Sequence, residues 1–310
     1  MSGPLPLEPL KAAARALGFD ACAVAPVSAE ADDGFDAWLA AGHHAGMDWM
    51  ARTRDLRQHI ALRLPEARSV VVVAANHHSP RPPAPAVSGL VSRYAWGRDY
   101  HRALLKPLRR LAAAITDLAP GARTSLSIDS APVRERAWAA RAGLGWIGKN
   151  SLILRQDLGS WFFLATIATT VEFTPGTPVP DRCGTCTACM DACPTGAITA
   201  PRVVDSNRCI AYQTIENRGG IPDALARKMG GWVFGCDLCQ EVCPWNRKTP
   251  DTERADFLPR PGAANPPLEQ LAEGNEEWFD ATFTGTPVRR AGLAGMKRNA
   301  LLVLKNREKR

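Results

Sequence analysis

The sequence lacks any apolar run of the roughly 20 residues that a transmembrane helix needs, and its N-terminus has no basic stretch followed by an apolar one. These absences argue against a membrane span and a secretory signal, so we expect a cytoplasmic protein with no membrane partner. In the cytoplasm disulfides are rare, and clustered cysteines usually bind a metal or take part in catalysis. Nine cysteines are present, and eight of them lie between Cys183 and Cys243.

Length and charge set further bounds. A chain of 310 residues can bury a sizeable core, and one large domain with a smaller one is expected. The net charge of +7 and the pI of about 9.1 suit a polyanionic partner such as nucleic acid, but they are equally consistent with simple solubility. Arginine dominates the basic residues, and its guanidinium makes bidentate phosphate contacts.

Hydrophobic patterning predicts a mixture of helices and strands in residues 1–172. We expect helices at 7–17, 101–118 and 134–142, with a break or kink at Pro107, and strands at 69–76, 124–129, 151–154 and 161–170. Residues 173–182 have the composition of a linker, and the cysteine-rich segment that they open runs to about residue 250. Residues 251–310 end in a basic helical tail. The predicted fold class is α+β with an N-terminal α/β domain.

The cysteines form two runs that complete each other. "CGTCTACMDACP" supplies Cys183, Cys186, Cys189 and Cys193, whereas "CDLCQEVCP" supplies only Cys236, Cys239 and Cys243. Cys209 lies between the runs and supplies the missing thiolate, so the count suits two [4Fe–4S] clusters. In two-cluster ferredoxins the fourth cysteine of each run binds the other cluster. The predicted ligand sets are therefore Cys183, Cys186, Cys189 and Cys243, and Cys193, Cys209, Cys236 and Cys239.

Two structural zinc sites are the alternative, because zinc also takes four cysteines. The x2, x2, x3-C-P spacing of the first run fits separated zinc knuckles poorly and favours iron–sulfur clusters. Cys22 stands apart in the sequence, and we interpret it as a buried, inert thiol.

The glycine-rich stretch "GLGWIGKN" matches two phosphate-binding patterns in the wrong context. Gly143, Gly145 and Gly148 satisfy G-x-G-x-x-G, and Lys149 completes a G-x-x-x-x-G-K pattern. Both motifs should follow a strand and open a helix, whereas this one follows a predicted helix and precedes a predicted strand. We therefore expect no NAD or ATP site, although the glycines would let the backbone approach another large cofactor closely.

Iron–sulfur clusters carry one electron at a time, so an organic reduction would need a second redox centre. The roughly 180 residues before Cys183 favour an enzyme over a simple electron carrier. Asp129 follows a predicted strand, where functional groups often project, and is our candidate catalytic acid. An Asx-turn or N-cap carboxylate is the structural alternative. Trp96, Trp146 and Trp245 flank the motifs and are candidate cofactor walls.

Four stretches together resemble the epoxyqueuosine reductase family over residues 10–300. They are "RYAWGRDYH" (93–101), "DSAPVRERAWAARAGLGWIGKNSLIL" (129–154), "GSWFFLATI" (159–167) and the two cysteine runs. The resemblance implies reduction of epoxyqueuosine to queuosine at the tRNA wobble position, with electrons passing from an external donor through two [4Fe–4S] clusters to cobalamin. It also implies a monomer with a nitroreductase-like domain at 1–172, a ferredoxin-like domain at 173–250 and a short HEAT-like helical segment at 251–310.

Carried over by position, the resemblance makes Asp129 the proton donor. It implies cobalamin contacts at Arg57, Ser92, Asp129, Arg136, Ile153 and Leu164, although some relatives carry cysteine where this chain has Ser92. The D-x-H-x-x-G motif that supplies a histidine to cobalt is absent, so cobalt would be held without one. A proton donor must be protonated near neutral pH, and we expect burial against the corrin to raise its pKa. The alternatives are a reductive dehalogenase-like corrinoid enzyme and a two-cluster electron carrier.

Overall fold

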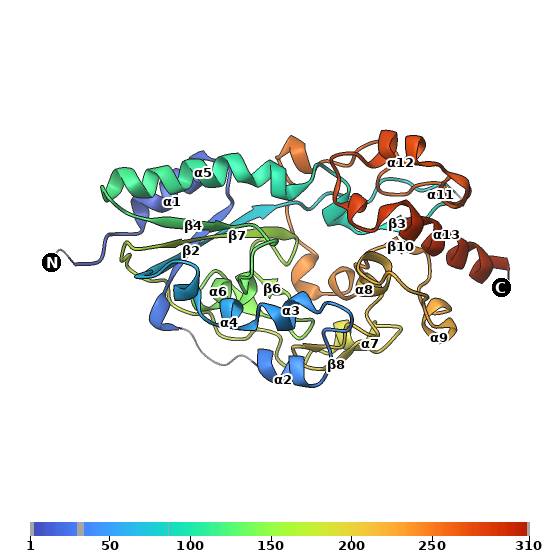
Figure 1. Ribbon diagram of the computed structural model, residues 1–310, viewed down its shortest axis with the longest axis horizontal. Helices are drawn as coiled ribbons and strands as arrows, with labels where there is room; N and C mark the ends of the chain where they lie inside the picture. Colours follow the sequence, from blue (N-terminus) through green and yellow to red (C-terminus); the bar gives the residue numbers. More distant parts are fainter. Residues whose placement is uncertain (1–2, 30–33, 86, 309–310) are drawn as a thin grey trace.

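The computed structural model describes residues 3–29, 34–85 and 87–308. Figure 1 shows an elongated molecule with a β-sheet between helices at one end and a group of helices at the other, and the two chain ends lie far apart. None of the described helices combines the length and apolarity that crossing a bilayer requires.

A four-stranded sheet forms the core of the N-terminal half. Its strands, in spatial order, are β1 (Ala21–Pro26), β2 (Ser69–Asn76), β7 (Phe162–Thr169) and β4 (Thr124–Ser127), and all neighbours pair antiparallel. Strand β2 is buried along its whole length. Val71 and Val73 pack on one face and Val70 and Val72 on the other, as the two-residue period of a strand requires. A strand that is covered on both faces is apolar at every central position.

Two long helices cover the first face of the sheet, namely α1 (Glu8–Ala16) and α5 (Tyr100–Leu118). Leu104, Leu108, Leu111 and Ile115 recur at helical spacing along α5 and are fully buried. Asp99 caps the helix, because its side chain accepts a hydrogen bond from the backbone N–H of His101. This cap matters for function, since it fixes the first turn of α5 beside the site described below.

The second face of the sheet is covered by α6 (Glu135–Arg141), whose Trp138 packs with Val70 and Val72. The surrounding short elements are η1 (Val27–Ala29), α2 (Phe35–Ala40), α3 (Trp49–Arg52), α4 (Arg54–Gln58) and η2 (Ile60–Leu62). A small hairpin of β5 (Trp146–Ile147) and β6 (Ile153–Leu154) follows α6.

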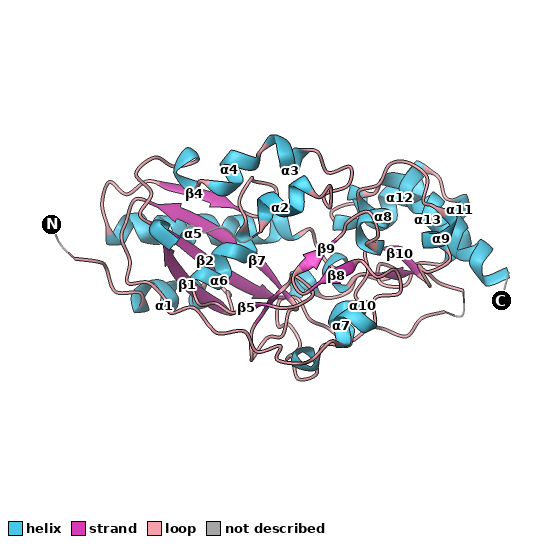
Figure 2. Ribbon diagram, turned by 90° about the horizontal axis from the view of Figure 1, so that it is seen from below, coloured by secondary structure: helices cyan, strands magenta, loops and turns pink. Residues whose placement is uncertain are grey.

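The cysteine-rich segment consists of short elements and long turns. They are α7 (Ala188–Asp191), β8 (Ile198–Ala200), β9 (Val203–Val204), α8 (Ile210–Ile215), α9 (Asp223–Ala226), β10 (Trp232–Phe234), α10 (Leu238–Glu241) and η4 (Pro244–Asn246). Strand β10 pairs in parallel with β3 (Leu90–Val91), which precedes η3 (Arg93–Ala95). This pairing joins the cysteine-rich segment to the N-terminal half, and Figure 2 shows β10 lying apart from the main sheet.

The C-terminal segment is helical and packs on that junction. It contains η5 (Ala255–Phe257), α11 (Leu268–Glu273), α12 (Glu276–Phe283), η6 (Pro287–Arg290) and α13 (Gly292–Glu308). Met296, Ala300 and Val303 of α13 share one core with Val91 of β3 and Phe234 of β10. The segment therefore holds the strand pair that connects the two halves.

The mixed helix-and-strand class and the buried strand at 69–76 are confirmed, as are the helices near 7–17, 101–118 and 134–142. A break at Pro107 is wrong, because α5 runs through it without interruption. Proline removes one backbone donor there, and the buried leucines on either side keep the helix on the sheet. Residues 173–182 are not free of contacts, since Thr174 and Gly176 donate backbone hydrogen bonds to Leu5 and Val24.

Leu108 and Leu105 of α5 provide a matched test of this packing. Leu108 is fully buried, whereas Leu105 is 37 % exposed. We expect Leu108→Ala to lower the free energy of unfolding by about 2–5 kcal/mol, because a cavity opens between helix and sheet. Leu105→Ala should change it by less than about 0.5 kcal/mol. Urea denaturation followed by circular dichroism measures both, and equal losses would contradict the packing.

Candidate functional site

The first predicted set of cysteines surrounds one cavity. The cavity has a volume of about 240 Å³, and its walls include Cys183, Cys186, Cys189 and Cys243. Cys243 comes from the second run and joins three cysteines of the first, because α7 and α10, which carry Cys189 and Cys239, lie against each other. Burial raises the pKa of Cys189, and the neighbouring Cys243 and Cys183 raise it further.

The second predicted set is gathered in the same way. Burial raises the pKa of Cys236, and so do the nearby thiolates of Cys209 and Cys193. Burial likewise raises the pKa of Cys239, followed by the charges of Cys236 and Cys209. Cys189 of the first set also contributes at Cys239, so the two sets are neighbours.

The first donor set has the form of a cluster site, because its four cysteines line one cavity. Among residues 3–29, 34–85 and 87–308, no three His, Cys, Asp or Glu side chains converge as the ligands of one metal ion do. The four ligands of a cube bind four different irons and therefore stand farther apart than those of a zinc ion. A cavity walled by four cysteines meets that requirement.

The glycine-rich stretch lies against both cysteine loops. It follows α6, contains β5 and precedes β6, so a helix precedes it and a strand follows it. The Lys149 ammonium donates to the backbone oxygens of Gly184, at 2.8 Å, and Cys186, at 2.9 Å. Asn150 Nδ2 donates to the backbone oxygen of Cys239 at 3.3 Å. Consecutive residues thus hold one loop of each cysteine set.

Asp129 occupies the turn between β4 and α6 with a positive φ of 56°, a backbone conformation that non-glycine residues rarely adopt. Tyr100 Oη donates a hydrogen bond to Asp129 Oδ2 at 2.6 Å, and His101 Nε2 lies 3.4 Å from the same oxygen. The Asp129 backbone N–H donates to Glu135 Oε1 at 2.8 Å. The first turn of α5 therefore holds the Asp129 carboxylate, and the first turn of α6 holds its backbone.

His101 stands between two carboxylates. Its Nδ1 lies 2.8 Å from Asp99 Oδ1, opposite the contact of its Nε2 with Asp129. Burial lowers the pKa of His101, but hydrogen bonds and charges from Asp129 and Asp99 outweigh this and raise it to about 9. His101 is therefore protonated at neutral pH.

The same contacts act on Asp129 in the opposite direction. Loss of hydration raises the pKa of Asp129, but the hydrogen bonds from His101 and Tyr100 outweigh it, so the pKa lies below its usual value. This differs from the sequence-based expectation of a raised pKa, because two donors sit on one carboxylate oxygen. These opposite shifts favour a proton on His101 over one on Asp129.

Glu135 supports the strained turn. Its Oε1 accepts from the backbone of Asp129 and from Ser127 Oγ at 3.1 Å. Glu135 keeps some exposed surface, but burial of its carboxyl group raises the pKa to about 7, and the charge of Asp129 adds to this effect. Glu135 is a positioning residue for Asp129.

Two of the predicted cobalamin contacts, Arg57 and Arg136, lie near Asp129. Burial lowers the pKa of Arg57, whereas the charges of Asp129 and Glu135 oppose it, so Arg57 is near both carboxylates. Ile153 and Leu164 pack in one hydrophobic cluster. Arg136 Nη1 donates to the backbone oxygen of Ser151, and the buried Ser151 Oγ has no partner among the described residues.

Ser92 lies at the junction of the two halves. It is 2 % exposed, and a side chain on Gly235 would collide with its Oγ. Its neighbour Arg93 donates its backbone N–H to Asp237 Oδ2 at 2.8 Å. Ser92 therefore packs against Gly235, the residue that precedes Cys236 of the second cysteine set. The unpartnered Ser151 hydroxyl, next to the contact of Arg136, fits a ligand that brings a polar group there.

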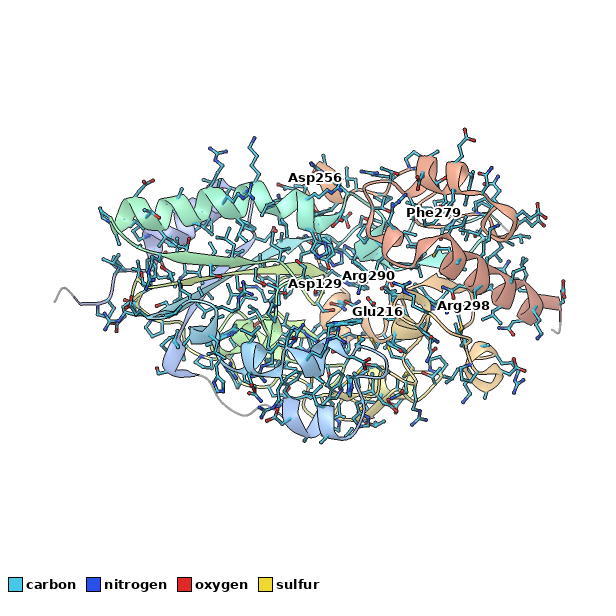
Figure 3. The ribbon with its side chains drawn as sticks, viewed as in Figure 1. Asp129, Glu216, Asp256, Phe279, Arg290 and Arg298 are labelled. Carbon is cyan, nitrogen blue, oxygen red and sulfur yellow. The ribbon has the colours of Figure 1, made fainter. Side chains whose placement is uncertain are left out.

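Sequence reasoning missed four residues of the site: Tyr100, His101, Glu135 and Arg290. The adjacent Tyr100 and His101 after a helix-capping aspartate gave a usable signal, but Arg290 gave none. Figure 3 labels Arg290, Glu216 and Asp129 between the sheet and the C-terminal helices. Arg290 pairs with Glu216 at 2.8 Å, and this contact raises its pKa, with a smaller contribution from Asp129. The C-terminal segment therefore reaches the edge of the Asp129 site.

Comparisons with known proteins agree with this arrangement. A family model described as "4Fe-4S double cluster binding domain" matches residues 182–246, and one described as "Epoxyqueuosine reductase QueG, DUF1730" matches residues 57–130. The epoxyqueuosine reductase of Synechocystis is 47 % identical, over 89 % of this chain and 98 % of its own length.

Two solved structures have similar folds. An epoxyqueuosine reductase bound to an epoxyqueuosine-modified tRNA stem loop is 31 % identical over 96 % of this chain and 80 % of its own, with a TM-score of 0.89. The Bacillus subtilis epoxyqueuosine reductase, whose aspartate-bearing catalytic loop is swung out of the active site, is 31 % identical over 96 % of this chain and 81 % of its own, with a TM-score of 0.88.

The crossed cysteine sets predict which variants share a phenotype. We expect Cys243→Ser to lose the same cluster signal as Cys183→Ser, although Cys243 belongs to the second run. Cys239→Ser, four residues earlier, should instead lose the signal that Cys193→Ser loses. Each variant should retain about half of the iron. Iron analysis and electron paramagnetic resonance (EPR) of the reduced proteins make the comparison, and a shared signal loss in Cys243→Ser and Cys239→Ser would contradict the sets.

Proposed function

The chain belongs to the epoxyqueuosine reductase family and reduces epoxyqueuosine in tRNA to queuosine, and we propose how its residues divide this work. The observation that carries the proposal is that the fold gathers the clustered cysteines in one half and the Asp129–His101–Tyr100 group in the other. The two sites approach each other around Tyr94, whose hydroxyl feels the charges of Asp129 and of Asp237, the residue after Cys236. Removal of an epoxide oxygen as water consumes two electrons and two protons. In this proposal the cysteine-rich segment delivers the electrons, and the Asp129 group delivers protons.

The proposed domains follow this division. Residues 1–172 form a nitroreductase-like domain that binds cobalamin, and residues 173–250 form a ferredoxin-like domain. Residues 251–310 form a helical segment, which would correspond to the start of a HEAT-like region. The placement of all eight clustered cysteines between Cys183 and Cys243 supports this partition, and so does the four-stranded sheet formed by residues 21–169.

The chain binds two [4Fe–4S] clusters, which when bound supply one-electron carriers. We assign one to Cys183, Cys186, Cys189 and Cys243, and the other to Cys193, Cys209, Cys236 and Cys239. Cys186 is the exposed member of these sets. It therefore marks the side that an external electron donor can approach, while the second set faces Ser92 and the proposed cobalamin site.

Cobalamin, when bound, supplies a cobalt centre that can be reduced to a strongly nucleophilic state. Its proposed contacts are Arg57, Ser92, Asp129, Arg136, Ile153 and Leu164. Ile153 and Leu164 offer an apolar surface, and Arg57 and Arg136 offer charge at its edge. No histidine is assigned to cobalt.

Asp129 is the proposed proton donor to the departing oxygen. Because the pKa of Asp129 is low and that of His101 is about 9, the proton is stored at His101 Nε2 and passes to Asp129 Oδ2, 3.4 Å away. Tyr100 and Glu135 hold Asp129 in place for this transfer. The swung-out loop of the Bacillus subtilis enzyme supports a catalytic role for an aspartate on a loop of this kind.

The substrate is large and anionic, which suits the net charge of +7. We propose that the tRNA approaches the edge of the Asp129 site where Arg290 lies, with the protein acting as a monomer. The solved relative with a tRNA stem loop supports tRNA as the substrate.

Substitution of Asp129 separates chemistry from assembly. We expect Asp129→Asn to retain clusters and cobalamin but to lose turnover by about 10²–10⁴-fold, because an amide cannot deliver the proton. Liquid chromatography of nucleosides from an epoxyqueuosine-modified stem loop measures turnover. Asp256→Asn is the control, since it removes only an exposed ion pair with Arg98. Normal turnover in Asp129→Asn would remove this residue from the mechanism.

The raised pKa of His101 predicts a pH dependence. Turnover should be sustained below pH 9 and should fall as the pH rises through about 9, where His101 loses its proton. His101→Gln should be slow at every pH and should lack this limb. His78→Gln is the control, because it breaks another histidine–carboxylate contact, with Asp251. An unchanged alkaline limb in His101→Gln would assign that limb to another group.

A further inference from the structure

Trp146 is a buried tryptophan that the proposed function does not use. It is 3 % exposed, and its indole Nε1 has no hydrogen-bond partner among the described residues. A buried indole N–H usually finds an acceptor, and one without a partner calls for an explanation. An acceptor that binds with a cofactor would provide one.

The surroundings of Trp146 identify that acceptor. Trp146 packs with Leu154, Cys243, Cys183 and Trp245, and all four line the cavity of the first cysteine set. The neighbouring Trp245 ring lies 5.0 Å away at 74°, but its Nε1 already donates to the backbone oxygen of Arg182 at 3.3 Å. Of these two indoles at the cluster cavity, Trp146 therefore has the N–H available.

A free thiol is a weak acceptor, whereas a thiolate bound to iron carries charge and accepts a stronger hydrogen bond. We propose that Trp146 Nε1–H donates to the iron-bound thiolate of Cys183 or Cys243, and thereby raises the reduction potential of the first cluster. Reduction adds negative charge to the cluster, and a hydrogen bond to its sulfur stabilises the reduced form more. This inference rests on the proposed assignment of the first cluster.

The glycine-rich stretch explains how Trp146 is held. Trp146 pairs with Leu154 across the β5–β6 hairpin. A Cβ on Gly145 would come within 2.0 Å of the Leu154 backbone oxygen, and one on Gly143 would come equally close to Thr177. Lys149 then fixes the loop of Cys186. The glycines thus permit the close backbone approach that puts an indole behind the cluster.

The test compares Trp146→Phe with Trp245→Phe in anaerobically prepared full-length protein that contains both clusters. Each variant loses an indole beside the same cavity, but only Trp146 has an unused N–H. EPR-monitored redox titration should show a lower reduction potential for the first cluster in Trp146→Phe than in the parent protein. A tenfold change in the one-electron equilibrium constant corresponds to a shift of about 59 mV. Trp245→Phe should shift it less, and the second cluster should not shift in either variant.

A second measurement uses the unsubstituted protein, in case Trp146→Phe fails to assemble. Protein labelled with ¹⁵N-tryptophan should show a nitrogen hyperfine coupling to the reduced first cluster in pulsed EPR, and Trp245→Phe should retain it. An unchanged potential in an intact Trp146→Phe cluster, equal shifts in both variants, or no tryptophan coupling would overturn the inference alone. Absence of iron and acid-labile sulfide from the parent protein would instead overturn the cluster assignment.

Discussion

The hydrogen bonds from Lys149 and Asn150 to the cysteine loops are the constraint on which the rest of the structure depends. They tie the backbone at Gly184, Cys186 and Cys239 to residues that follow the sheet helix α6. The same helix begins at Glu135, which holds Asp129. One continuous stretch therefore contacts both the Asp129 group and the loops of both cysteine sets. A reductive deoxygenation needs this, because electrons and protons must reach the same small ring.

The protonation of the Asp129 group follows from how its donors are shared. Tyr100 and His101 both face Oδ2 of one carboxylate, so the charged form of Asp129 is favoured even where hydration is lost. Contacts with the carboxylates of Asp129 and Asp99 stabilise the protonated form of His101 and raise its pKa. In the proposed mechanism, His101 can therefore store the proton while Asp129 stays ionised. The positive φ at Asp129 is tolerated because Glu135 Oε1 accepts a hydrogen bond from the Asp129 backbone N–H and so stabilises the turn.

The sequence predicted features that depend on local periodicity or on a count. The strand at 69–76 could be recognised because four consecutive valines suit a strand buried on both faces. The division of the cysteines into two sets comes from their spacing and from the lone Cys209, and stays a prediction. The predicted break at Pro107 is wrong, because the packing of Leu104 and Leu108 against the sheet outweighs the loss of one backbone hydrogen bond. Arg290 could not be found, since its contacts with Glu216 and the Trp49 ring join residues far apart in the chain.

The glycine-rich stretch shows why a motif needs its structural context. A nucleotide loop uses glycines to bring backbone N–H groups to a phosphate at a helix N-terminus. Here the glycines let backbone meet backbone, at Leu154 and Thr177, and the lysine that would neutralise a phosphate donates to carbonyls instead. Both uses need residues without side chains at points of close approach. The stretch opens a hairpin instead of a helix. It therefore connects the two halves of the molecule and positions the Trp146 indole against the first cysteine set.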